Sequence, residues 1–542
     1  MSTTATRTVE AQPSPKKGMS LLKSVRTPAL VAVIVVAAWT AVAFAFEGRY
    51  VLPYPRTLVQ QVITDWGLLW ANAAVSLDIA VKGFVVGVLV ILPLAVLCIA
   101  IPSIEAIVIK VAIVVHVIPF IAIAPVLVVS LKGEAFGITI TALQVYFALL
   151  IGILLGLRSA DKSAMDVVTA SGGGTWSRLR YVRFASAAPS LVAGLQIAVP
   201  AALLGSLISE FFGASEGLGA ILVNAQEQLL IDRTWAIAVF IGLLASAGYG
   251  AITLIARVAM PWAGRGASVG TTVAGTEAQN LSHTQAILGS LVSAVVLLGF
   301  WQMLRTVFQL DAYFTKSPWE IVQFLFESNP VTGAPASVFW GQFGTALVET
   351  AIDASVGFVV GTLIAVIAAV IMVAFEGLGR AVMPLAIMLR SVPLIALTPV
   401  IVLVFGRDLL GVTVVVTLVV FFPTLVTVMM GLRATPEGAI DVIRASGGSA
   451  VSAARRVRIL YAIPSITAST RIAIPAAITG ATLAEWLATG KGLGNLLIMA
   501  AVNADYFTLW AAGVVLVVIV LVVYGLIGWI DRMVLRRLGM AD

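Results

Sequence analysis

Long apolar runs recur along the whole chain, and each is long enough to cross a lipid bilayer. About 20 mostly apolar residues span the hydrocarbon core as a helix. The chain is 60% hydrophobic and 11% charged, with a mean hydropathy of +1.06, too little charge to cover a soluble surface of this size. The sequence therefore predicts an all-α membrane protein. About twelve spans are expected, at roughly 28–46, 75–99, 106–131, 135–157, 191–212, 234–258, 285–306, 348–374, 381–405, 409–432, 466–487 and 508–530.

The N-terminal segment is expected to be a tail followed by an uncleaved first helix. Residues 1–26 are rich in Ser, Thr and Pro and predict a disordered cytoplasmic tail. The apolar run 28–46 could also be a signal peptide, but it is longer than the roughly 7–15 apolar residues usual there, and further spans follow. The single cysteine, Cys98, lies in an apolar run and is expected to be a buried core thiol.

Basic residues collect in alternate loops, which predicts the orientation of the chain. The stretch 158–190 is rich in Arg and Lys, whereas the loop after the fifth span is acidic. By the positive-inside rule the first is cytoplasmic and the second external, and both termini lie inside. The net charge of +7 is explained by these basic loops of a membrane protein, so it does not indicate a nucleic-acid partner.

The chain contains an internal duplication. Residues 166–219 align without a gap onto 441–494, and 24 of the 54 positions are identical. Upstream, the segment 83–87 recurs as 357–361. The predicted organisation is a tail at 1–26, a first repeat at 27–258, a cytoplasmic linker at 259–284 and a second repeat at 285–538.

The number of spans in each repeat predicts the symmetry. Six crossings are an even number, so both repeats enter the membrane in the same direction. Parallel repeats are related by an axis along the membrane normal. Two such halves enclose a central path, which favours a transporter over a membrane enzyme.

Each repeat carries one polar insertion, at 158–190 and at 433–465. Each insertion predicts two short helices broken at a glycine pair, because glycine allows a sharp turn. Basic residues follow, and Pro189 and Pro464 are expected to start the next span. The insertions could be solvated basic connectors, but the recurrence of the same pattern in both repeats argues against this.

The insertions resemble those of a known family. Their order of an acidic residue, three others, then Ala-Ser-Gly resembles the loop of ATP-binding-cassette importer permeases. The segments 209–219 and 55–60 look like the branch that carries aliphatic sulfonates, taurine, nitrate or thiamine precursors. The resemblance implies a coupling helix seated in a cleft of an ATPase subunit. Its implied residues are Asp166, Ala170, Gly172 and Gly173 in one repeat and Asp441, Ala445, Gly447 and Gly448 in the other.

Two features depart from that family pattern. The acidic residue is Asp in both repeats, where the family has Glu. The Leu-Pro usual near the end of the loop is Phe184-Ala185 and Ile459-Leu460.

The resemblance also implies partners and a location. It implies two ATPase subunits, an extracytoplasmic solute-binding protein and a bacterial cytoplasmic (inner) membrane, with one chain supplying both halves. The chain lacks the Gly-x-x-x-x-Gly-Lys-Ser/Thr loop that cradles phosphates. We therefore expect it to bind no cofactor and no metal, and to leave ATP and magnesium to the partner. With His116 and His283 as its only histidines, it does not suggest an enzyme.

Two basic positions inside spans are candidates for the path. Charged groups there are costly and usually face the protein interior or water. Arg390 corresponds to His116 in the other repeat, and Arg471 corresponds to Gln196. Two arginines facing the path would favour an anionic solute. Alternatively, they are neutralised by partners such as Glu349 or Asp353, or they snorkel to the interface.

Other repeated residues are candidates for a gate or for the binding-protein side. Prolines remove helix hydrogen bonds in the third span of each repeat, which would permit bending or merely shape a static kink. Acidic residues end the fifth spans, where they face the binding protein or cap a solvated helix end. These candidates are Pro119, Pro125, Pro393, Pro399, Glu210 and Glu485.

The sequence thus favours an importer permease that moves a solute inward by alternating access. The alternative is a proton- or ion-coupled secondary transporter, because parallel six-helix halves occur there too. Such a protein would not need the two basic insertions. The sequence leaves the transported substrate open.

Overall fold

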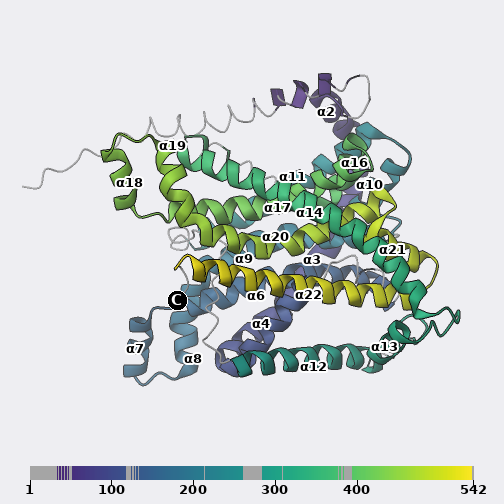
Figure 1. The fold of residues 1–542 in the computed structure, drawn as a ribbon, viewed down its shortest axis with the longest axis horizontal. Coiled ribbons are helices and arrows are strands. Elements are labelled where there is room, and N and C mark those ends of the chain that lie inside the picture. The colour runs from purple at the N-terminus through teal and green to yellow at the C-terminus, as the bar shows by residue number, and fades with distance from the viewer. Residues whose placement is uncertain are drawn as a thin grey trace, which may run out of the picture.

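The computed structural model describes residues 52–117, 133–212, 214–260, 283–307, 311–375 and 394–539, together with scattered residues between these ranges. Helices make up nearly all of the described secondary structure (Figure 1). The expected tail and most of the expected linker lie outside the described residues.

The two repeats contain matching sets of helices. The first repeat contains α2 (Pro55–Thr64), α3 (Trp66–Ala100), α4 (Pro102–Val117), α6 (Glu134–Arg158), α7 (Lys162–Ala170), α8 (Thr175–Arg178), α9 (Phe184–Phe211), α10 (Leu218–Glu227) and α11 (Ile231–Ala259). The second contains α12 (His283–Val307), α13 (Pro318–Phe326), α14 (Ala336–Ala374), α16 (Leu394–Phe405), α17 (Leu409–Arg433), α18 (Glu437–Ala445), α19 (Ala450–Ala453), α20 (Ile459–Ala484), α21 (Gly492–Val502) and α22 (Tyr506–Arg537). Three π-helical segments lie between them: η2 (Leu179–Arg183), η5 (Ala454–Arg458) and η6 (Glu485–Thr489).

Eight of the predicted spans are present as helices of membrane-crossing length. Among the described residues, 7 helices are long and apolar enough to cross a bilayer, and a pair that includes α20 and α21, bent by 51°, makes up to 8. The other predicted spans are 28–46, 106–131, 285–306 and 381–405, and residues outside the description interrupt the first, second and fourth of these. Helix α12 covers all of 285–306, and α4 and α16 occupy parts of 106–131 and 381–405.

Each repeat is built around three tightly packed helices, α3, α6 and α9 in the first and α14, α17 and α20 in the second. The duplicated glycines explain part of this packing. A side chain at Gly83 would overlap Thr141 of α6, and one at Gly357 would overlap Val416 of α17. Small residues allow membrane helices to approach closely, so these glycines fix the α3–α6 and α14–α17 contacts.

The two halves interlock and share one apolar core. Helix α16 packs against α9, α10 and α11 of the first repeat, and α4 packs against α12 and α22 of the second. The largest buried cluster draws on both halves, for example Leu207 and Ile241 from the first and Leu483 and Leu497 from the second. Burial of this shared surface stabilises one particular arrangement of the halves.

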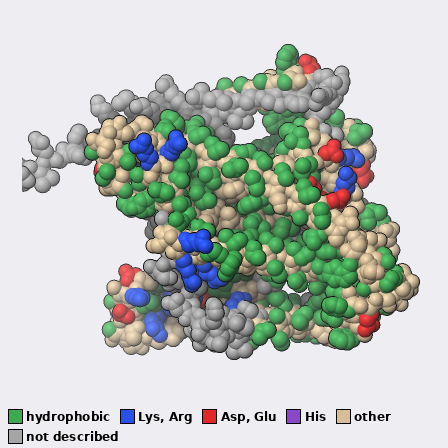
Figure 2. Space-filling model, in the orientation of Figure 1, with side chains coloured by type: hydrophobic (Ala, Val, Ile, Leu, Met, Phe, Trp, Pro, Cys, Tyr) green, Lys and Arg blue, Asp and Glu red, His purple; other side chains and the backbone are tan. Residues whose placement is uncertain are grey.

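Both insertions lie at the same end of the molecule, as parallel repeats require. Helices α7 and α8 and helices α18 and α19 all lie at the left of Figure 1, whereas α10, α13 and α21 lie at the right. We call these the insertion end and the opposite end. In Figure 2 the Lys and Arg side chains gather mainly toward the insertion end, and several Asp and Glu side chains lie at the opposite end.

One ion pair holds the opposite end of the first repeat together. The Arg233 guanidinium donates to Asp65 through Nε at 2.8 Å and Nη2 at 2.9 Å, which joins the α2–α3 junction to α11. This hydrogen bonding holds the pKa of Asp65 below its usual 3.8. Because the folded-state pKa is lowered, the pair stabilises the fold fully above about pH 3.8, and that stabilisation is lost as the pH falls further.

Cys98 is a buried thiol in the core of the first repeat, as expected. The expectation that Pro189 and Pro464 start the fifth spans is wrong. Both lie inside helices, α9 and α20, which begin earlier at Phe184 and Ile459. The helix continues because the π-helical segments η2 and η5 connect it to the preceding short helix without a break.

Candidate functional site

The two insertions contain the same turn with the same backbone geometry. In the first, the N–H of Gly173 donates to Val168 O at 2.8 Å, and the N–H of Gly172 donates to Thr169 O at 3.0 Å. This pair of bonds is the Schellman motif that ends a helix, and it needs a left-handed residue. Gly172 supplies it with a φ of 78°. The sequence predicted the break at this position.

The second insertion repeats these contacts. Gly448 N–H donates to Ile443 O at 2.9 Å, and Gly447 N–H donates to Arg444 O at 3.0 Å. Gly447 also has a φ of 78°. A side chain at Gly172 or at Gly447 would meet nothing within 4 Å, so both turns are open on their outer side. We call these two structures the paired turns.

The helices that precede the paired turns expose apolar residues. Val167 is 66% exposed and Val442, its counterpart, is 65% exposed. The predicted residues Asp166 and Asp441 are exposed beside them. The exposed valines thus occupy matching places in the two insertions. The sequence analysis missed the valines, although both follow the predicted aspartates directly.

The π-helical segments connect the paired turns to the membrane helices. Segments η2 and η5 occupy equivalent positions, directly before α9 and α20. The departures from the family pattern, at Phe184-Ala185 and Ile459-Leu460, follow them directly. Single π-helical turns are rare and occur often at functional sites.

At the opposite end, a buried carboxylate caps a short helix in the first repeat. Glu210 is 2% exposed, and its Oε2 accepts from the N–H of Gly219 at 2.6 Å. The N–H of Leu218 donates to Ser76 Oγ at 2.9 Å, and that of Gly217 donates to Asn72 Oδ1 at 2.8 Å. Three side chains thus satisfy the first free N–H groups of α10.

The second repeat has a similar cap, in which Thr350 replaces Ser76 and Glu349 takes the role of Asn72. Glu485 is fully buried, and its Oε2 accepts from Gly494 N–H and from Thr350 Oγ1, both at 2.9 Å. Leu493 N–H donates to Thr350 Oγ1 at 2.9 Å, and Gly492 N–H donates to Glu349 Oε2 at 2.8 Å. Glu349 here does the work of Asn72. We call these two arrangements the buried caps.

The buried caps correct one alternative from the sequence. Glu210 and Glu485 are not at a solvated helix end, because both carboxylates are enclosed and bonded. Glu349 is likewise bonded to α21 and does not neutralise an arginine among the described residues. Their role toward a binding protein stays a prediction.

Aromatic residues meet between the two halves beside the buried caps. The ring of Phe212 stacks on Trp486 with centroids 4.6 Å apart, and Phe211 meets the same ring at 6.3 Å. Phe211 and Trp486 are equivalent positions of the duplication, offset by 275. Equivalent residues that touch lie near the pseudo-symmetry axis, so this aromatic cluster joins the two halves near the axis at the opposite end. The sequence analysis did not single these residues out.

The candidate path residues bond within their own halves. Gln196 donates to Thr253 Oγ1 at 3.0 Å. Its counterpart Arg471 donates to Gly528 O at 2.9 Å and lies 3.1 Å from Asp531 Oδ2. Arg471 therefore has an internal carboxylate partner, although it is Asp531 and not Glu349 or Asp353. A role of Gln196 and Arg471 in the path stays a prediction.

The remaining candidates are only partly described. The ring of His116 stacks on Phe147 with centroids 3.9 Å apart. Arg390, Pro119, Pro125 and Pro393 lie outside the described residues, and Pro399 lies within α16.

The fold and the site define a duplicated, all-helical membrane protein with two matched insertions at one end. The family model described as binding-protein-dependent transport system inner membrane component matches residues 105–265 and again 361–536. The chain therefore belongs to this family and contains its domain twice. It is a multi-pass membrane protein and an ABC importer permease.

Relatives support the same conclusion. A probable ABC transporter permease protein of Haemophilus influenzae is 29% identical over 244 residues, which are 45% of this chain and 95% of the relative. The formylaminopyrimidine transport permease protein ThiX of Halalkalibacterium halodurans is 28% identical over 36% of this chain and 76% of its own length. The taurine transport system permease protein TauC of Escherichia coli is 22% identical over 43% and 88%. Each relative thus matches less than half of this chain, as expected when two permease units are fused. No solved structure matches the chain.

Proposed function

We propose that this chain supplies both membrane halves of an ATP-driven importer located in the bacterial cytoplasmic membrane. The paired turns dock on two separate ATPase subunits, which bind the ATP and magnesium, and the chain itself binds no cofactor. An extracytoplasmic solute-binding protein delivers the solute at the opposite end. Both termini then lie on the cytoplasmic side.

The observation that carries this proposal is the match between the two insertions. Their turns have the same hydrogen bonds and the same φ, and both expose a valine at the same place. Two identical motor subunits need two equivalent docking surfaces facing the same way. A secondary transporter has no use for such a pair, and membership of the importer family favours the ATP-driven alternative.

The proposed solute is a small, anionic or thiamine-precursor-like molecule. This follows the functions for which relatives are named, which include aliphatic sulfonate, taurine and formylaminopyrimidine transport. Of the two predicted path arginines, Arg471 is paired with Asp531, so attraction of an anion to the path would rest on Arg390.

Transport is proposed to occur by alternating access. The aromatic cluster of Phe211, Phe212 and Trp486 joins the halves at the opposite end, so rocking of the halves would part it and open the path outward. Each nucleotide state of the ATPase must favour one of the two arrangements for this to work.

Uptake into proteoliposomes tests the proposal. The chain is reconstituted with its cognate ATPase and binding protein, and uptake of labelled taurine, a sulfonate and formylaminopyrimidine is measured. We expect one probe to accumulate only with ATP on the ATPase side and to be unaffected when the proton gradient is collapsed. Uptake that needs a proton gradient and no ATPase would contradict the proposal.

Removal of the stacked tryptophan is expected to weaken the closure at the opposite end. Trp486→Ala loses an aromatic pair worth roughly 0.5–1.5 kcal/mol, which shifts the balance between closed and open arrangements about two- to tenfold. We expect ATP hydrolysis without binding protein to rise by a similar factor. Trp70→Ala is the control, because Trp70 stacks on Trp66 within one half. Equal hydrolysis rates in both variants would mean that Trp486 does not hold the halves closed at the opposite end.

A further inference from the structure

The second repeat lacks an ion pair that the first repeat has. In the first, Arg158 at the end of α6 pairs with the buried Glu105 of α4. At the offset of 274, Glu105 corresponds to Gly379. A side chain at Gly379 would come within 2.6 Å of Met372 O, so no carboxylate fits there. Arg433, the counterpart of Arg158, is therefore left without this partner.

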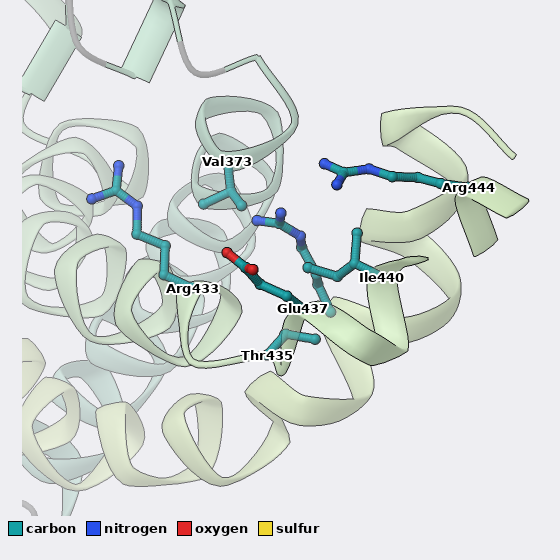
Figure 3. A pocket seen from close by; sticks show the side chains of 7 residues that line it. Val373, Arg433, Thr435, Glu437, Ile440 and Arg444 are labelled. Carbon is teal, nitrogen blue, oxygen red and sulfur yellow. The ribbon is translucent and has the colours of Figure 1, made fainter. Parts of the chain in front are cut away.

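A polar cavity of about 460 Å³ opens beside Arg433. Its lining residues are Val373, Arg433, Thr435, Glu437, Ile440, Arg444 and Arg458. Val373, Thr435 and Ile440 are buried, and the charged side chains surround them, with Arg433 and Arg444 on opposite sides of Glu437 (Figure 3). We call this the basic pocket.

Two of the three arginines in the basic pocket lack a carboxylate. Within the described part of the chain, neither Arg433 nor Arg458 has an acidic oxygen within 4.0 Å. Arg444 lies 3.3 Å from Asp441, and both side chains are exposed there. One carboxylate, Glu437, thus faces three guanidinium groups. The pocket is suited to an anion, and guanidinium groups bind phosphate oxygens in pairs.

The basic pocket lies at the level where membrane helices end. Val373 is one residue from the end of α14, Arg433 is the last residue of α17, and Arg458 directly precedes α20. One turn farther into the membrane, Met430 on α17 and Tyr461 on α20 are exposed. This is the height at which phospholipid headgroups lie, and basic pockets between membrane helices bind anionic headgroups.

We propose that the basic pocket binds the headgroup of an anionic phospholipid, with Arg433 and Arg458 holding its phosphate. The exposed Met430 and Tyr461 would contact the upper part of its acyl chains. Among its described residues the first repeat has no equivalent arginine pair free to bind a phosphate, because Arg158 is engaged by Glu105 and Thr169 stands where the second repeat has Arg444. The chain binds one such lipid, and it does so without the ATPase.

The experiment uses the purified full chain in a neutral detergent. Its melting temperature is measured with added dioleoylphosphatidylglycerol, with dioleoylphosphatidylcholine and with sodium phosphate, and native mass spectrometry counts retained lipids. We expect phosphatidylglycerol to raise the melting temperature in a saturable manner and to add one retained lipid, and the other two to do neither. In the double variant Arg433→Gln with Arg458→Gln, we expect the apparent Kd to be roughly thirtyfold weaker.

The matched control is Arg455→Gln with Arg456→Gln. It removes two charges from the same short segment, but these exposed side chains do not line the pocket. This control should bind phosphatidylglycerol like the native chain, and unliganded melting temperatures verify that both double variants fold. Equal weakening in both variants would mean attraction by surface charge alone and would overturn the site. An equal response to sodium phosphate would mean that the basic pocket binds free anions and not a lipid headgroup. A response only in the presence of the ATPase would mean that the pocket belongs to the interface with the ATPase. Either result would overturn the proposal.

Discussion

Arginine at Gly172 and Gly447 is expected to abolish ATP-driven uptake while leaving the protein folded in the membrane. Both glycines have a φ of 78°, a conformation that costs other residues roughly 1–2 kcal/mol. The added side chain meets nothing within 4 Å, so the fold tolerates it, but it projects from the surface proposed to dock on the ATPase. We expect the affinity for the ATPase to fall more than tenfold, equivalent to about 1.4 kcal/mol or more.

Gly333→Arg is the matched control for these variants. Gly333 has a φ of 69° and open space around it, but it lies between α13 and α14 at the opposite end. It therefore carries the same backbone strain and the same added charge away from the paired turns. Binding of the ATPase is measured by pull-down and uptake by filtration. Normal ATPase binding in the Gly172 and Gly447 variants would show that the paired turns do not dock.

Gly492→Ala is expected to have the largest effect on stability. A side chain there would overlap the carboxyl group of Glu485, and the residue has a φ of 75°. The variant must either displace a fully buried carboxylate or break the cap of α21. Overlap and strain together are expected to lower the free energy of unfolding by roughly 2–5 kcal/mol. The measurement is the melting temperature and the yield of monodisperse protein, both of which should fall.

Gly490→Ala isolates the contribution of the overlap. Gly490 lies two residues earlier, has a φ of 70° and has nothing within 4 Å of its added side chain. Its free energy of unfolding should fall only by the roughly 1–2 kcal/mol that the backbone strain costs. Similar melting temperatures for the two variants would mean that the second buried cap does not limit stability.

The duplicated parts of the structure could be predicted because each repeat tests the other. The helix breaks at Gly172 and Gly447 follow from the same residues appearing twice, and the structure gives both the same turn. The apolar runs likewise predicted the long helices, since an apolar run of about 20 residues is long enough to cross a bilayer as a helix.

The contacts between distant segments could not be predicted. Glu485 was located correctly at the end of the fifth span, but its burial depends on Thr350, which lies 135 residues away. One alternative gave Arg471 a carboxylate partner on the second span of its repeat, such as Glu349 or Asp353, and its actual partner is Asp531 on the last helix. A single sequence does not show which of several acidic residues a fold brings close.

The aromatic cluster was missed for a related reason. The duplication was read through identical residues, whereas Phe211 and Trp486 differ. Only the structure shows that these equivalent positions meet between the halves. Differences between the repeats are thus as informative as identities, and Gly379 in place of Glu105 is a second example.

The number of ATPase subunits bound by one chain tests the central claim most directly. The purified chain in lipid nanodiscs is mixed with an excess of its cognate ATPase, and the mass of the complex is measured by native mass spectrometry. Docking at both paired turns predicts two ATPase subunits on one chain, with fewer when Gly172 or Gly447 is replaced by arginine. A chain that binds no ATPase, or binds it equally well after both replacements, would contradict the account.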